Sequence, residues 1–485
     1  MLDKSHNSSY TISVDLLVSA IAGVNSEKPS LYQQAADYFR HEPANEKKLT
    51  QLKTEIRDVK LALQTRSGKS ARVLEQQLQR LNKKYDVERL SQQAQRTLRL
   101  NDAIDVCLDI LSLSEGEDFE ETQLKTSKLL TTLVLFSPEK GKNLAELHHS
   151  LKPAYKAVLS LRVLDKLISN GVLKNAYILK NHNTEKRYEP DAINYECYKQ
   201  AVILPIMLAG IFQDVGLQHP ALTELLEGKE GRKDRFRSLK KLEREEMLAL
   251  NYQHTVDYLK NGLGCQQAGA KKEHEIAEFD EAEQKRLKFQ LGLMVDANSS
   301  KRGTSEIIKI PQIYASVVFS TKRDYQRKNL PTASILIAQL AIKKVISPQV
   351  SEVFVSIVGQ FPLGFGIAYI AQDMNGNELD FYEYAIVSSL NPPLKDQPIS
   401  RFVTKNLMFL PHGKTGVVKK TRNLHFQAAR KKLVKIDPKR LAEVMQKLSH
   451  NFRVNDDKPV VPYYWEPHEY FCVQGNQNLW SARTR

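Results

Sequence analysis

The sequence has few cysteines and no long apolar run, and both absences narrow the class of protein. The four cysteines of the 485 residues lie far apart, without a Cys-x-x-Cys pair, at Cys107, Cys197, Cys265 and Cys472. This spacing argues against a disulfide framework and against a thiolate zinc site, so we expect a reducing, cytoplasmic compartment. No stretch reaches the roughly 18 consecutive apolar residues of a membrane span, and no basic region followed by an apolar run opens the chain. We therefore expect neither a membrane-spanning helix nor a secretory signal.

Motifs of common enzyme classes are also missing. The sequence contains no His-Glu-x-x-His helix, no Gly-x-Gly-x-x-Gly after a strand and no Gly-x-Ser-x-Gly elbow. The Gly-Lys-Thr within residues 412–416 lacks the earlier glycine of a phosphate loop, because Met408 occupies that position. His148 and His149 have no carboxylate at metal-ligand spacing, so we expect them to be surface residues.

What is present is an ordinary globular composition with an uneven positive charge. Hydrophobic residues make up 41% of the chain and charged residues 26%, which excludes wholesale disorder. The formal net charge is +15, of which residues 46–100 contribute +8 and residues 401–485 contribute +11, while the rest of the chain is slightly acidic. Such basic segments favour anionic partners, although each could instead be a solvated face that keeps the protein soluble.

Apolar periodicity predicts a mainly α fold with an N-terminal helical hairpin or coiled coil. Within residues 46–100, apolar residues recur at spacings of three and four on both sides of a break at Ser67-Gly68. Two readings fit this pattern, an antiparallel hairpin and a single long helix that forms an intermolecular coiled coil. The expected seam contains Leu49, Leu52, Ile56, Leu78 and Leu81.

Changes in apolar periodicity and in charge along the chain predict four consecutive segments. Residues 1–100 form an N-terminal helical region with the basic hairpin, and residues 101–185 form a helical linker domain. Residues 186–360 form a second helical domain, which contains the apolar run AVILPIMLAGIF. After residue 360, period-two alternation and an Asn-Gly turn signal predict a small β-rich extension over 361–485, with one helix and an aromatic tail.

Three helical segments and one turn occur in an order that is similar to one known family. AVILPIMLAGIFQDVGL (201–217) is similar to a buried helix that ends in His-Asp-x-Gly-Lys, and MLALNYQHTVDYL (247–259) to the next ligand-bearing helix. IPQIYASVVFSTKRDYQR (310–327) is similar to a helix with a metal-binding aspartate and an Arg-x-Tyr-Arg turn. Residues 359–364 read Gly-Gln-Phe-Pro-Leu-Gly, where the family has Gly-x-Tyr-Pro-x-Gly. Over about 190–370 the chain thus resembles bacterial HD-GYP phosphodiesterases, which hydrolyse cyclic di-GMP at a two- or three-metal site.

The active-site positions implied by this resemblance carry other residue types. The family's His-Asp pair aligns with Gln213-Asp214, and its next ligand histidine aligns with Asn251. An amide supplies no charge to balance a pair of divalent ions, so we expect a catalytically inactive, HD-like helical domain without a metal or other cofactor. The vestigial active-site positions are Gln213, Asp214, Leu217, Asn251, Asp296 and Tyr314.

The resemblance favours a binding, scaffolding or regulatory module that could still bind a cyclic dinucleotide. We expect a protein partner, reached through the coiled coil or through the basic C-terminal surface. Nucleic acid fits less well, because few aromatic residues interleave with the basic ones. The expected dinucleotide contacts are Lys301, Arg302, Arg323 and Tyr325, and the expected partner patch is Arg430, Lys431 and Lys432.

The alternative is an active metal-dependent cyclic di-GMP phosphodiesterase with a non-standard ligand set. It would hold two divalent metals, iron or manganese, at residues whose spacing in the sequence is irregular. These residues are Asp214, His219, His254, Asp296 and either Glu185 or Glu196.

Overall fold

The computed structural model describes residues 7–23, 28–182, 196–269, 272–298, 303–449 and 461–480. The chain divides into two compact units, each assembled from segments that are distant in the sequence. Unit 1 comprises Met1–Ile21, Cys107–Ile211 and Gly292–Arg485, and unit 2 comprises Ala22–Val106 and Phe212–Leu291. This division differs from the four consecutive segments predicted above, since two long helices, α3 (Lys69–Ser114) and α11 (Glu273–Asn298), each continue from one unit into the other.

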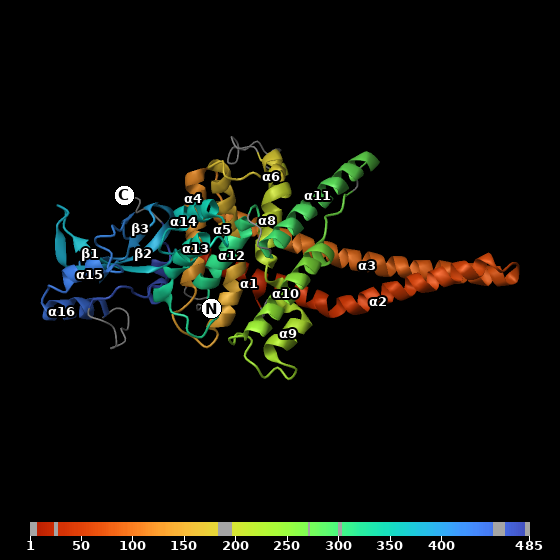
Figure 1. Cartoon of the computed structure of the whole chain (residues 1–485), viewed down its shortest axis with the longest axis horizontal. Coiled ribbons are helices and arrows are strands. Elements are labelled where there is room, and N and C mark those ends of the chain that lie inside the picture. The colour runs from red at the N-terminus through yellow and green to blue at the C-terminus, as the bar shows by residue number, and fades with distance from the viewer. Residues whose placement is uncertain are drawn as a thin grey trace. The chain divides into compact units, whose positions relative to one another are not determined.

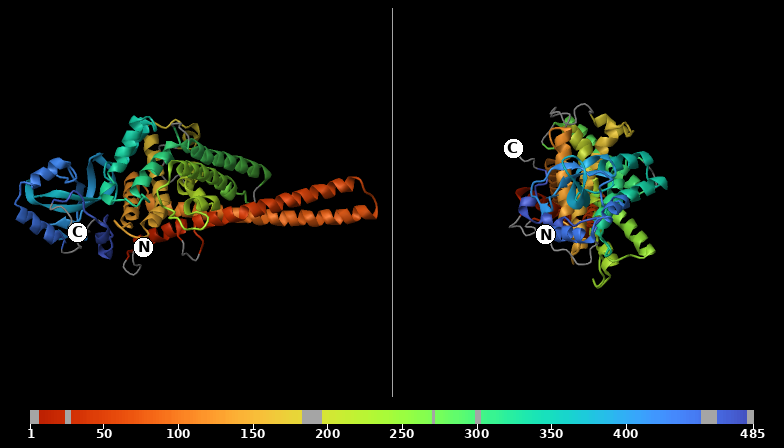
Figure 2. Two further views of the ribbon diagram at one scale, coloured as in Figure 1. Left: turned by 60° about the horizontal axis from the view of Figure 1, so that its bottom comes forward. Right: turned by 90° about the vertical axis from the view of Figure 1, so that its left-hand side faces the viewer.

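Unit 2 contains a long helical hairpin. Its first helix, α2 (Leu31–Gln64), and α3 run side by side in opposite directions from a turn at residues 65–68 (Figures 1 and 2). Gly68 in this turn has a φ of +69°, a conformation that residues with a side chain rarely adopt. The other elements of unit 2 are η4 (Val215–Gln218), α9 (Pro220–Glu227), α10 (Lys241–Asp257), η5 (Tyr258–Leu263) and most of α11.

The hairpin confirms the predicted antiparallel seam. Val59 and Leu81 are buried along it, and the five predicted seam residues are all buried or half-buried. Lys48 forms an ion pair with Glu88 across the two helices. The pairing therefore lies within one chain, as in the first of the two readings.

Helix α2 is one continuous helix with a proline in its interior. It starts at Leu31, where Ser30 forms a capping box with Gln33, and it continues through Pro43 without a break. A proline removes one backbone donor from a helix, and the 34 residues of α2 accommodate that loss.

Unit 1 has a helical core around α5 (Leu144–Ser169). Helix α12 (Glu306–Val318) packs along α5, and the rings of Tyr155 and Tyr314 stack between them with centroids 6.5 Å apart. Helix α8 (Leu204–Phe212) is buried along its whole length, as its apolar run predicts. The other helices here are α1 (Ser9–Ala22), α4 (Phe119–Leu135), α6 (Ala176–Asn181), η3 (Lys199–Ile203), η6 (Arg327–Asn329), α13 (Thr332–Ile342) and α14 (Pro348–Val358).

The β-rich extension predicted after residue 360 is present in unit 1. Its four-stranded antiparallel sheet has the order β1-β2-β3-β6, with β1 (Gly366–Gln372), β2 (Glu378–Leu394), β3 (Gln397–Phe402) and β6 (Thr415–Val417). Strands β4 (Thr404–Lys405) and β5 (Met408–Phe409) form a separate pair. The predicted Asn-Gly turn joins β1 to β2, with Gly376 at a φ of +86°.

Helices and the C-terminal tail cover this sheet. Helices α15 (Gln427–Leu433) and α16 (Pro438–Ser449) share a hydrophobic cluster with β1 and β2, beside which Figure 1 shows them. The tail, with α17 (His468–Phe471) and η7 (Gln474–Asn476), forms a second cluster through Trp465. Among the helices of the described ranges, none has both the length and the apolar character needed to span a bilayer.

Candidate functional site

The positions aligned with the HD-GYP active site are divided between the two units. Unit 2 contains Gln213, Asp214, Leu217 and Asn251, whereas unit 1 contains Asp296 and Tyr314.

In unit 2, Gln213 and Asn251 lie next to each other. Asn251 Nδ2 donates a hydrogen bond to the backbone oxygen of Gln213 at 3.4 Å. The backbone at Gly216 approaches Asn251 so closely that a side chain would not fit there, because a Cβ on Gly216 would lie 2.2 Å from the Asn251 carbonyl oxygen. The side-chain oxygens of Gln213 and Asn251 are both buried without a hydrogen-bond partner among the described residues. The pair thus presents two neutral acceptor oxygens.

In unit 1, Tyr314 is part of the hydrophobic core. Its ring stacks on Tyr155 and meets Phe354 edge to face, with centroids 5.1 Å apart. Burial raises the pKa of the Tyr314 phenol well above its ordinary value, so the group stays neutral. Asp296 is half-buried in the last turn of α11.

Two residues of the alternative ligand set, His219 and His254, do meet. Their rings stack face to face, with centroids 3.5 Å apart and planes inclined by 6°. Burial, followed by the charge of His254, lowers the pKa of His219 to about 4, so the pair is neutral near pH 7. The lone pairs of parallel rings lie in separate planes and do not converge on one ion at the ~2.0–2.1 Å of a metal–imidazole bond.

The remaining members of that set do not join this pair in the described part of the chain. Glu196 forms an ion pair with Lys199, and Glu185 lies outside the described residues. No group of three or more His, Cys, Asp or Glu side chains suited to a metal ion occurs among the residues that the structure describes.

The expected dinucleotide contacts have different surroundings. Lys301 and Arg302 lie outside the described residues, and Arg323 is exposed. Tyr325 is an interior packing residue, because its hydroxyl donates to Val318 O at 3.2 Å. Burial raises the pKa of Tyr325 to about 12.

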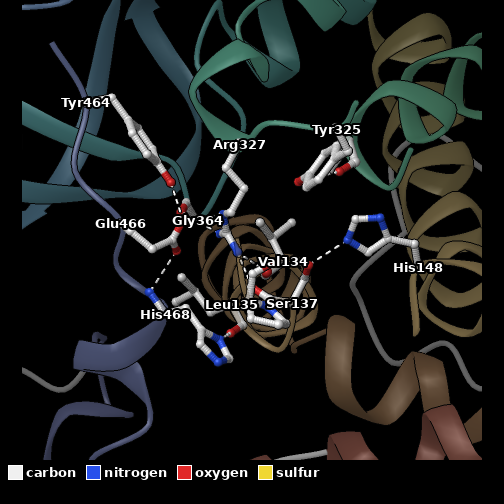
Figure 3. Close-up of polar contacts among 12 residues, drawn as sticks. Val134, Leu135, Ser137, His148, Tyr325, Arg327, Gly364, Tyr464, Glu466 and His468 are labelled. Atoms are coloured by element: carbon white, nitrogen blue, oxygen red, sulfur yellow. Dashed lines mark hydrogen bonds and ion pairs between the residues drawn. The ribbon is translucent and has the colours of Figure 1, made fainter. Parts of the chain in front are cut away.

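A buried polar network surrounds Arg327, which is 0% exposed (Figure 3). Its guanidinium donates to the backbone oxygens of Val134 at 3.1 Å, of Ser137, and of Gly364 at 3.4 Å. Its Nε lies 3.4 Å from a carboxylate oxygen of Glu466. Arg327 thus joins the end of α4, the loop before β1 and the C-terminal tail.

Glu466 is held in place by its neighbours in the tail. It accepts hydrogen bonds from the Tyr464 hydroxyl and from the backbone nitrogen of His468. The His468 ring donates in turn to Leu135 O at 2.7 Å, so it caps the end of α4 beside Arg327. Burial alone would lower the pKa of Arg327, but Glu466 and Tyr464 raise it above its ordinary value and keep the group charged.

The prediction that His148 lies at the surface is wrong, since its side chain is fully buried. Its Nδ1 donates to Ser320 O at 2.7 Å, and its Nε2 accepts from the Ser137 hydroxyl at 2.6 Å. Burial lowers the pKa of His148 to about 4, so the imidazole is neutral. A hydroxyl and a base at this distance resemble a nucleophile pair, but both are buried against α4 and the Arg327 loop. We therefore assign the pair a structural role.

The predicted basic patch on α15 is partly engaged within the chain. Arg430 Nη1 donates to Leu424 O and His425 O, both at 2.8 Å. Lys432 Nζ lies 2.6 Å from Glu378 on β2, while Lys431 is exposed. Two of the three charges thus also hold the extension together.

A polar groove of about 810 Å³ in unit 2 is absent from the predicted sites. It lies between the halves of α2 and α3 that are distant from their turn. Arg96 and Arg99 line it, and their Nε atoms donate to Leu263 O and Gly262 O at 3.0 Å each. Guanidinium and amide groups also dominate the wall contributed by α3, with Arg89, Gln92, Gln93 and Gln95. No sequence motif marks the groove, because its walls come from separate helices.

Together, these elements define a mainly helical protein with an antiparallel helical hairpin and a small sheet. Comparison of the chain with protein-family models, with curated proteins and with solved structures gave no match. Its function must therefore be argued from its own residues.

Proposed function

We propose that the chain is a catalytically inactive, HD-GYP-like protein that acts as a binding and scaffolding module. The proposal is carried by one observation, the contact between Gln213 and Asn251. The resemblance puts metal-ligating histidines at these two positions, and here both are amides.

The chemistry of the two amides supports an inactive site. Hydrolysis of a phosphodiester at a di-metal centre requires imidazole and carboxylate ligands that hold the ions and lower the pKa of a bridging water. Amide oxygens can accept hydrogen bonds in the same space, but they are poor ligands for iron or manganese. Of the aligned His-Asp pair, Asp214 keeps the residue type of the family, whereas Gln213 replaces its histidine.

The test combines metal analysis with a turnover assay. Protein purified without chelator should contain no stoichiometric iron or manganese, and it should not hydrolyse cyclic di-GMP when Mn²⁺ is added. A Gln213→His, Asn251→His double variant is the matched comparison, and it should gain Mn²⁺ affinity. Turnover by the wild-type protein that disappears in Asp214→Ala would overturn the proposal.

The polar groove of unit 2 supports a second candidate function, the binding of a cyclic dinucleotide without cleavage. Its volume of about 810 Å³ lies in the range of small-molecule sites. Arginine and glutamine side chains recognise phosphates and the edges of bases. Fluorescently labelled cyclic di-GMP should bind the wild-type protein and bind Arg89→Glu more weakly. Arg72→Glu, an equal charge reversal on α3 outside the groove, should bind it like the wild type.

A further inference from the structure

Helix α3 carries an apolar face that α2 does not cover. Val87, Leu90 and Leu98 are 61%, 56% and 60% exposed, and Ala94 between them is also exposed. Their spacings of three, four and four residues place them on one side of the helix. The seam with α2 uses a different side of α3, on which Leu81 is buried.

The same face ends in opposite charges. Arg80 lies seven residues before Val87, and Asp105 lies seven residues after Leu98. Seven residues are close to two helical turns, so both charges continue the apolar face. Both side chains are exposed, and neither forms an ion pair with another described residue.

The charge along α3 runs against its helix dipole. Residues 69–90 carry a net charge of +3, and residues 101–109 carry −3. A helix dipole favours acidic residues near the N-terminus and basic residues near the C-terminus, so this order is unfavourable within the isolated helix. It is favourable beside a second α3 that runs in the opposite direction, because each basic half then faces an acidic half.

We propose that this face of α3 mediates homodimerisation, with two copies of the helix packed antiparallel about a twofold axis near residues 92–93. In that register Val87 faces Leu98 of the second copy, and Leu90 faces its Ala94. Arg80 then faces Asp105 of the second copy, and the symmetry repeats every contact twice. A second copy matches both the apolar spacing and the charges at the two ends. The inference needs only the surface of α3 and does not rest on the functions proposed above, although Leu98 also lines the polar groove.

Sedimentation velocity on the full chain tests the apolar part of the interface. The wild-type protein should show a dimer at about 100 μM that weakens as salt is raised, since part of the attraction is electrostatic. Leu90→Asp should weaken dimerisation about 100-fold or more, because it places two carboxylates at the centre of the interface. Leu61→Asp is the matched control, since Leu61 is 54% exposed on α2 and outside the face. A monomeric wild type, or equal effects of the two variants, would overturn the proposal.

Charge reversal tests the antiparallel register. Arg80→Asp alone and Asp105→Arg alone should each weaken the homodimer about tenfold, because like charges then meet twice. Mixing these two variants should restore a dimer, since each chain then offers the complement of the other. Circular dichroism should match the wild type for both variants, as both positions are exposed. Failure of the mixture to dimerise better than either variant alone would refute the register. Binding of this face of α3 to a different protein in place of a second copy would overturn the proposal.

Discussion

Replacement of Arg327 by methionine should strongly destabilise unit 1. Methionine keeps much of the length of the side chain but removes the positive charge and all the donors of the guanidinium. Glu466, whose side chain is 13% exposed, then loses its ion-pair partner. The carbonyls of Val134, Ser137 and Gly364 lose donors at the same time.

The size of the effect follows from this burial. Removal of one partner from a buried ion pair costs about 3–5 kcal/mol, mainly because the other charge stays buried without compensation. Carbonyls left unpaired add to this cost, although the contributions within one network are not additive. We expect the free energy of unfolding to fall by about 3–5 kcal/mol, a large part of the ~5–15 kcal/mol typical of a domain.

Tryptophan fluorescence is a specific assay for this change. The chain has two tryptophans, both in the C-terminal tail, and their indole nitrogens donate to β2. Trp465 donates to Ala385 O and Trp480 to Ser388 O, each at 2.9 Å. A urea titration followed at these indoles therefore reports the docking of the tail on the sheet, and Arg327→Met should lower its midpoint.

Two comparisons make the result interpretable. Arg323→Met, at an exposed position of the same loop, should move the free energy of unfolding by no more than about 0.5 kcal/mol. An Arg327→Met, Glu466→Gln double variant should recover part of the loss, because no stranded carboxylate remains. The reasoning is refuted if Arg327→Met and Arg323→Met unfold at the same urea concentration.

Three further outcomes can be measured on single variants. Burial keeps the pKa of His148 at about 4, below the ~6.5 of an unfolded chain, so the unfolded state binds more protons between these values. The free energy of unfolding should thus fall by about 3 kcal/mol as the pH drops from about 6.5 to 4, whereas the full contribution of His148 is present above this window. His148→Gln should show a flatter dependence of stability on pH. Leu52→Asp, in the α2–α3 seam, should reduce the helical circular dichroism signal, and an unchanged signal would contradict the seam. Arg430→Ala should destabilise the extension by about 1–3 kcal/mol through its lost charged hydrogen bonds, whereas Lys431→Ala should not, and equal effects would show that Arg430 is only a surface charge.

Local sequence patterns determined much of the helical architecture. The seam of the hairpin follows from apolar spacings of three and four, and its turn follows from Ser67-Gly68, so both can be read without tertiary information. The buried character of α8 and the start of α16 at Pro438 are likewise local, as is the Asn-Gly turn of the sheet. Each of these features depends on neighbours within a few turns or strands.

The tertiary structure alone decided which polar residues are buried together. His148 has an unremarkable local setting. It is interior because the backbone oxygen of Ser320, 172 residues away, accepts a hydrogen bond from its ring. Arg327 and Glu466 meet for the same kind of reason, as do the stacked rings of His219 and His254. The resemblance to HD-GYP proteins suggested that Gln213 and Asn251 lie close together. Hydrophobic periodicity gave no indication of this contact. Hydrophobic periodicity reports which face of an element is buried, whereas the partner of a buried charge is chosen by packing between distant segments.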